Sequence, residues 1–443
     1  MPSAIYNFPR GFLWGTATSS HQVEGNNKNN NFWAWEHEPG KIIDGHRSGL
    51  ACDWWGGRWR EDFDRMKESN QNAHRLSIEW SRVQPTPDRW DEDALDHYRQ
   101  MLQRLGELKI TPMITLHHFC DPLWISELGG WENESIVDRF AAYAEKTAAA
   151  LSEYNNLWVT INEPNVLAVY AYLFGLFPPG KNDIRLLGTV YSNMIKAHSA
   201  AYQVIHQIQP TARVGIATNY RSAKPSISWN PLDRSMVSLI HSVFNNAVPK
   251  ALQDGVLRLP WSRTRIPDAK KTQDFLGVNY YTRDNVAFSF LHSDEAFMHT
   301  YFDPDRELST TGFIANEPEG IFEALKWGMN FKLPIIVTEN GIEDEDDNVR
   351  PSYLVQHLHQ IWRAVNFNWP VKGYFHWTLV DNFEWERGWT QKFGLWELDV
   401  ETQVRRRRPS VDLYAAICGV NGISSDVVQK YAPQAFDQLF PGG

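Results

Sequence analysis

The chain has 443 residues, with 43 lysines and arginines against 53 acidic residues, and a formal net charge of −10 at pH 7. This acidic balance argues against nucleic acid and other polyanionic partners. The length exceeds that of a minimal domain, yet no Ser/Gly-rich linker divides the sequence, so we predict one domain spanning residues 1–443.

The cysteines and the N-terminus predict a cytoplasmic protein. Cys52, Cys120 and Cys418 are an odd number without C-x-x-C spacing, which indicates neither a disulfide framework nor a zinc site. The first fifteen residues contain no continuous apolar segment, and no run of about eighteen apolar residues occurs anywhere. We therefore expect no signal peptide and no membrane span.

Aromatic residues are abundant, with 20 Trp, 16 Tyr and 23 Phe. Indole rings stack well on the C–H faces of sugars, but a large barrel also packs many aromatic side chains in its core. Composition alone leaves both explanations open.

Short apolar runs rich in β-branched residues alternate with longer amphipathic stretches, which is typical of parallel strands joined by helices. In the helix expected at 135–154, apolar residues recur at three- and four-residue steps and form one face; another helix is expected at 91–109. The eight expected strands lie within residues 12–20, 74–82, 111–119, 157–163, 213–219, 274–282, 333–340 and 371–382.

Most of these runs end in polar residues. In a parallel barrel the carboxyl ends of the strands share one face, where the following loops build the active site. A doubly wound sheet is disfavoured, because its G-x-G-x-x-G motif is missing. We predict an α/β fold, a (β/α)8 TIM barrel with loop insertions on the catalytic face. The longest insertion, about 283–317, is interpreted as a substrate wall or, alternatively, a disordered flap.

Two glutamates end predicted strands. Glu163 lies in TINEPN and Glu339 in VTENG, each after an apolar run. A pair of carboxyl groups is what glycosidic bond cleavage requires, although a single glutamate at a helix N-terminus or on a rim is the commoner case.

Taken together, these motifs resemble those of glycoside hydrolase family 1, the β-glucosidase-like enzymes. The resemblance covers nearly the whole chain and includes FLWGTATSSHQVEG (12–25), HRLSIEWSR (74–82), FLGVNYYT (275–282) and GYFHWTLVDNFEWERGWTQKFGL (373–395). It implies hydrolysis of terminal β-D-glucosides, and of β-galactosides or β-fucosides, by a double displacement that retains configuration. No cofactor and no metal are expected.

The resemblance also implies the role of each site residue. Glu163 would be the general acid/base, with a raised pKa, and Glu339 the nucleophile. Arg75, Asn279 and Tyr281 would support Glu339, with Arg75 and Tyr281 keeping it ionised. The residues expected to bind substrate are Gln22, His118, Asn162, Trp377, Glu384, Trp385 and Phe393. For Phe393 the alternative is packing in the core.

Two positions bear on the sugar that binds. The family usually has Trp where this chain has Phe119, so one indole N–H donor to the glycone is missing. Glu384 suits an unmodified hexose and would repel a phosphate, whereas relatives that cleave 6-phosphoglycosides usually carry a small hydroxyl residue there. The alternative is that Glu384 is a rim charge and that Arg387 and Lys392 bind phosphate.

Other features point to less. Adjacent His117 and His118 should face opposite sides of a strand, which argues against joint metal binding. The run Arg405–Arg408 is interpreted as a solvated loop pairing with Glu397, Asp399 and Glu401.

Two alternative functions remain to be weighed. Transglycosylation uses the same covalent intermediate as hydrolysis and stays an alternative, whereas a sugar-binding pseudoenzyme is disfavoured because both carboxylates are present.

Overall fold

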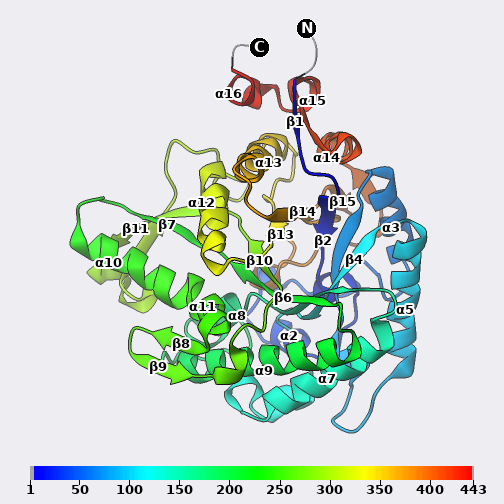
Figure 1. The fold of residues 1–443 in the computed structure, drawn as a ribbon, viewed down its shortest axis with the longest axis vertical. Coiled ribbons are helices and arrows are strands. Elements are labelled where there is room, and N and C mark those ends of the chain that lie inside the picture. Colours follow the sequence, from blue (N-terminus) through cyan, green and yellow to red (C-terminus); the bar gives the residue numbers. More distant parts are fainter. Residues whose placement is uncertain (1–3, 442–443) are drawn as a thin grey trace.

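The computed structural model describes residues 4–441 and contains a closed barrel of eight parallel strands (Figure 1). The strands follow the order β10-β13-β14-β2-β3-β4-β5-β6 around the barrel. Their bounds are β2 (Leu13–Ala17), β3 (Ala73–Ser77), β4 (Thr111–His117), β5 (Leu157–Asn162), β6 (Arg213–Asn219), β10 (Phe275–Asn279), β13 (Ile335–Asn340) and β14 (Val371–Trp377).

All eight predicted runs contain or overlap one of these strands, so the predicted barrel is confirmed. Most of the strands end before the predicted run does. After β3 the chain turns into helix α4 (Trp80–Val83), and after β4 it leaves the sheet at Phe119, whose φ is 69°. The polar ends of these two runs therefore belong to loops, whereas Asn162, Asn219 and Asn279 are the last residues of their strands.

A ring of helices covers the barrel, one in each connection between successive strands and one after β14 (Figure 1). The apolar face predicted for 135–154 is buried, from Ile136 and Phe140 to Leu151. Burial of such faces is what stabilises the helices against the sheet. The eight helices are α3 (Trp59–Glu68), α5 (Glu92–Glu107), α7 (Ile136–Leu151), α9 (Leu186–Ile208), α11 (Ala247–Asp254), α12 (Pro318–Gly328), α13 (Arg350–Asn366) and α14 (Pro409–Val420).

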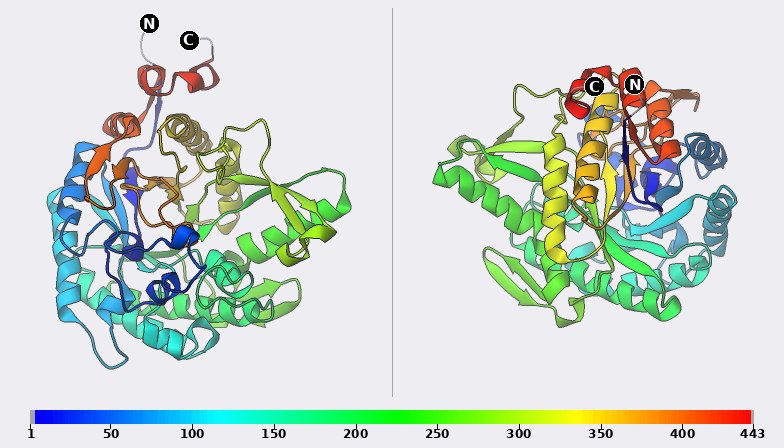
Figure 2. Two further views of the ribbon diagram at one scale, coloured as in Figure 1. Left: turned by 180° about the vertical axis from the view of Figure 1, so that it is seen from behind. Right: turned by 45° about the horizontal axis from the view of Figure 1, so that its top comes forward.

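The segment predicted as one loop insertion at 283–317 contains regular structure. Strands β11 (Arg283–Phe288) and β12 (Met298–Tyr301) join β7 (Ser222–Pro225) in a three-stranded sheet, with β11 in the middle. Figures 1 and 2 show this sheet and helix α10 (Pro231–Ile240) projecting from one side of the barrel. The alternative of a disordered flap is wrong, because the backbone pairs with strand β7 from the preceding connection.

The four arginines at 405–408 do not form a solvated loop. Arg405–Arg407 is strand β16, paired with β15 (Trp396–Leu398). Arg406 reaches Glu397 and Asp399, as predicted, but Arg405 is buried against Asp62 and Arg408 against Asp381. Two of the four arginines are therefore paired with buried carboxylates in the interior.

The remaining elements are short and lie in the connections or near the chain ends. Strand β1 pairs with β17, which brings the two ends of the described chain together. Within residues 4–441 we find no helix with the length and apolar character needed to cross a bilayer. These elements are β1 (Ile5–Asn7), β8 (Val256–Leu259), β9 (Ser262–Arg265), β17 (Gly422–Ser424), α1 (Ser20–Val23), α2 (Asn31–Glu36), α6 (Leu123–Glu127), α8 (Pro164–Tyr172), α15 (Ser425–Tyr431) and α16 (Phe436–Leu439).

Candidate active site

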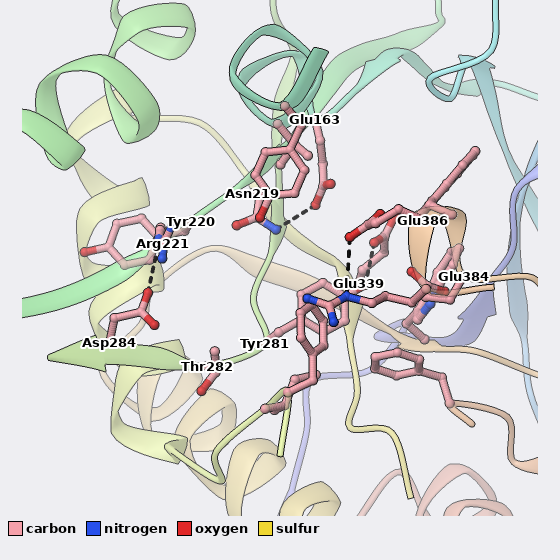
Figure 3. A pocket seen from close by; sticks show the side chains of 18 of the residues that line it. Glu163, Asn219, Tyr220, Arg221, Tyr281, Thr282, Asp284, Glu339, Glu384 and Glu386 are labelled. Carbon is pink, nitrogen blue, oxygen red and sulfur yellow. Dashed lines mark hydrogen bonds and ion pairs between the residues drawn. The ribbon is translucent and has the colours of Figure 1, made fainter. Parts of the chain in front are cut away.

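A cavity of about 460 Å³ opens at the carboxyl ends of the strands (Figure 3). Its volume is in the range of small-molecule sites. Eight of the twelve predicted site residues line it: His118, Glu163, Tyr281, Glu339, Trp377, Glu384, Trp385 and Phe393. The other four, Gln22, Arg75, Asn162 and Asn279, are fully buried and hydrogen-bond to residues that line it.

Glu339 lies near the end of β13 and is 3% exposed. The Arg75 guanidinium donates a hydrogen bond to Oε1, and the Tyr281 hydroxyl donates to Oε2 at 2.6 Å. Burial raises the pKa of Glu339, while Arg75 and Tyr281 oppose that rise. Arg75 and Tyr281 thus favour the ionised nucleophile, as expected, but their effect on its pKa is smaller than the effect of burial.

Glu163 directly follows β5 and has a left-handed backbone, with φ at 45°. Such backbone is uncommon outside glycine and often marks functional positions. Its Oε1 accepts hydrogen bonds from the neutral amides of Asn219 at 2.9 Å and Asn279 at 2.8 Å. Burial, and then the nearby Glu339 carboxylate, raise the pKa of Glu163 to about 8. The protonated acid is therefore favoured at neutral pH.

A buried hydrogen-bond network fixes both carboxyl groups. Arg75 also donates to the Oδ1 of Asn162 at 2.7 Å, and Asn162 donates to the Nε2 of His118 at 3.0 Å. Asn279 bridges to Asn162 at 3.2 Å and accepts from the Thr338 hydroxyl at 2.6 Å. Strands far apart in the sequence are thus joined at the floor of the cavity.

One end of the cavity is lined by Glu384 and Glu386 and is its acidic end. Gln22 donates to Oε2 of Glu384 at 3.0 Å and to the Phe383 carbonyl at 2.9 Å. Glu384 and Glu386 are both partly buried. Burial, followed by the charges of Glu386 and Glu339, raises the pKa of Glu384 to about 8. The expectation of a fixed negative charge at Glu384 therefore holds only above that pH.

A comparison of this sequence with protein families matches the model described as Glycosyl hydrolase family 1 over residues 5–423. The chain belongs to glycosyl hydrolase family 1. It is a retaining β-glycosidase that acts on O-glycosyl bonds.

The matches to known relatives cover almost the whole length of the glycosidase. It is 32% identical to beta-glucosidase A of Thermotoga maritima, with 95% of this chain and 99% of that protein covered. The structure of a beta-glycosidase from Pyrococcus horikoshii is 35% identical, with a TM-score of 0.89 and coverage of 97% and 98%. The Thermotoga maritima beta-glucosidase in complex with glucoimidazole is 31% identical, with a TM-score of 0.86 and coverage of 94% and 100%.

Aromatic residues of the glycosidase both line the cavity and pack in the interior. Trp377 and Phe393 belong to one buried cluster, and Phe393 meets Tyr281 edge to face at 6.0 Å. The two interpretations of Phe393 are therefore compatible. Trp385 stacks on His118 with ring centroids 5.9 Å apart. Phe119 packs against Trp385 at 5.0 Å, so the residue in place of the usual Trp fills the same wall.

Adjacent His117 and His118 have separate partners. Nε2 of His117 is 2.9 Å from Oδ1 of Asp121, whereas His118 contacts Asn162 in the cavity. Cys52, Cys120 and Cys418 are buried and unpaired. His118 therefore belongs to the site, whereas His117 and the three cysteines do not line the cavity.

Sequence reasoning missed several residues of the site. Asn219 contacts Glu163 and closes the fifth predicted strand, so the rule about polar strand ends could have found it. Glu386 lies two residues from Glu384 and lines the same end. The ion pair of Arg221 with Asp284 joins residues 63 positions apart, and no sequence signal links them.

Proposed function

We propose that the glycosidase hydrolyses terminal, unphosphorylated β-D-glucosides, and β-galactosides or β-fucosides, by double displacement. Glu339 attacks the anomeric carbon while Glu163 protonates the leaving oxygen; Glu163 then takes a proton from the water that releases the sugar. The supporting observation is the contrast between the two carboxyl groups. Glu339 is paired with a guanidinium and a phenol, whereas Glu163 is held by two neutral amides and has a pKa near 8.

The other site residues follow from this assignment. Arg75 and Tyr281 hold the nucleophile, and Asn279 lies between the two carboxyl groups. Asn162 and His118 bind glycone hydroxyls next to Glu163. At the far end, the residues proposed to hold the sugar are Gln22, Trp377, Glu384, Trp385 and Phe393.

We also propose that residues 1–443 act as one domain, because one apolar cluster extends from Phe8 to Phe440. Its partners are small-molecule glycosides. The cytoplasmic location stays a prediction. Transfer to an alcohol in place of water would use the same two glutamates, and measuring released aglycone against free sugar in the presence of an alcohol distinguishes the two outcomes.

We expect the first sugar released from an aryl β-glycoside to be the β-anomer, because two inversions at the anomeric carbon restore its configuration. NMR within the first minutes, before mutarotation, measures the product. A sample of the pure sugar under the same conditions gives the mutarotation rate as a control. First appearance of the α-anomer would contradict the role of Glu339.

We expect kcat/KM for alkyl glucosides to fall as the pH rises through about 8, because Glu163 then loses the proton that the leaving oxygen needs. A dinitrophenyl glucoside, whose leaving group needs no proton, should show a much weaker decline. In Glu163→Gln the decline should vanish for this activated substrate. If the decline persists unchanged in that variant, another group is the acid.

We expect an aryl β-glucoside to be cleaved faster than its 6-phosphate, since the carboxylates of Glu384 and Glu386 repel the phosphate group. The preference, as a ratio of kcat/KM values, should grow with pH through about 8 as Glu384 ionises. Glu384→Ser should reduce it, whereas Arg387→Gln tests the alternative that Arg387 binds phosphate. A faster phosphorylated substrate would overturn the specificity and leave the mechanism intact.

A further inference from the structure

An ion pair lines the cavity away from its acidic end. Nε of Arg221 donates to Oδ2 of Asp284 at 2.7 Å, with side-chain exposures of 32% and 11%. In Figure 3 this pair and Glu384 lie on opposite sides of Glu339. The pair therefore faces a part of the cavity that a sugar held at Glu384 does not fill.

The position of Arg221 along the chain places it beside the leaving group. Asn219 ends β6 and holds Glu163, and Arg221 follows two residues later, before β7 begins. Asn219, Tyr220 and Arg221 all line the cavity, so this segment forms a continuous part of its wall next to Glu163. Because Glu163 must reach the glycosidic oxygen, the group bound on the Arg221 side is the one that leaves.

Hydrogen bonds fix the backbone of both residues of the ion pair. Asn245 is fully buried; its Oδ1 accepts from the Arg221 backbone N–H at 3.0 Å, and its Nδ2 donates to the Arg221 carbonyl at 2.9 Å. Asp284 lies in β11, in register with Ala223 of β7. The two side chains therefore start from fixed backbone positions.

Several donor and acceptor atoms of the ion pair are available to bind a ligand. Among residues 4–292 and 295–441, no hydrogen bond joins Nη1 or Nη2 of Arg221, or Oδ1 of Asp284, to another protein atom. A guanidinium beside a carboxylate offers donors and acceptors side by side. Neighbouring hydroxyls of a sugar ring match this arrangement, since one can accept from Arg221 while the next donates to Asp284.

The walls near the ion pair are aromatic, and the pair itself has no net charge. Sugar rings stack on such side chains through their C–H faces. Asp284 neutralises Arg221, so the pair has no net charge that would favour an anionic leaving group. The aromatic residues on these walls are Tyr170, Tyr220, Phe244, Tyr301 and Phe302.

We propose that Arg221 and Asp284 anchor a second sugar ring, so that β-linked disaccharides and oligosaccharides are the preferred substrates. This inference rests on the proposed role of Glu163. The pair is a specificity determinant, because it contacts the leaving sugar and takes no part in bond cleavage.

The test compares cellobiose with cyclohexyl β-glucoside. Both leaving groups are six-membered rings that leave as alkyl alcohols, but only cellobiose carries ring hydroxyls. In Arg221→Gln and Asp284→Asn, kcat/KM for cellobiose should fall roughly ten- to hundredfold, the usual effect of losing a hydrogen bond to a charged group. For cyclohexyl β-glucoside it should change little, which also shows that the variants fold.

The matched control is Arg258→Gln, since Arg258 pairs with Asp254 outside the cavity at 2.8 Å. It should leave both substrates unaffected. An equal loss for the two substrates, no loss for cellobiose, or a parent enzyme that cleaves only cyclohexyl β-glucoside would overturn the inference. A parent that cleaves neither, nor any aryl β-glucoside, would instead overturn the proposed function.

Discussion

Replacing Glu163 and Glu339 by alanine should produce losses that differ in kind. Glu339→Ala should lower kcat roughly ten-thousand-fold or more, because no covalent intermediate forms. Glu163→Ala should lower it by roughly a hundred- to ten-thousand-fold for leaving groups that need a proton. With an activated aryl β-glucoside and azide, Glu163→Ala should yield the β-glycosyl azide, formed from the covalent intermediate. Glu339→Ala should yield the α-glycosyl azide, formed by direct attack.

NMR of the azide products distinguishes the two roles, and interchanged anomers would mean that the assignment is reversed. Glu343 provides the control. It is a buried glutamate that accepts from Thr311 and does not line the cavity. Glu343→Ala should therefore give no azide-dependent product.

Arg75→Met should remove both activity and stability. The Arg75 side chain is fully buried, and its loss leaves Glu339 without a cationic partner. Breaking one side of a buried ion pair typically costs about 3–5 kcal/mol of unfolding free energy. The pKa of Glu339 should rise further, so the loss of stability should be largest where Glu339 is ionised and should shrink as the pH falls. Denaturant unfolding at several pH values measures this dependence.

Two further variants separate the charge effect from general damage. Arg75→Met combined with Glu339→Gln removes the unpaired charge and should recover part of the lost stability. Arg405→Met breaks another fully buried pair, with Asp62, which lies outside the cavity. It should lower stability to a similar degree while keeping kcat/KM for the folded enzyme. Unchanged activity in Arg75→Met would contradict the proposed support of Glu339.

The sequence by itself determined the barrel. Eight apolar runs and the helices between them have local periodicities, which depend only on residues close together in the chain. Polar residues at the strand ends also located Glu163 and Glu339, because parallel strands in a barrel present their carboxyl ends on one face. Helical periodicity is also a local property, so the residues on the buried face of α7 could be predicted one by one.

The tertiary structure alone decided which side chains meet and what their surroundings do to them. The burial that raises the pKa of Glu163 and Glu384 to about 8 comes from several strands at once. The sequence shows two arginines, Arg405 and Arg221, without their partners, yet one is buried against Asp62 and the other faces the cavity beside Asp284. Contacts between distant segments set desolvation and charge pairing, and these quantities have no local pattern in the chain.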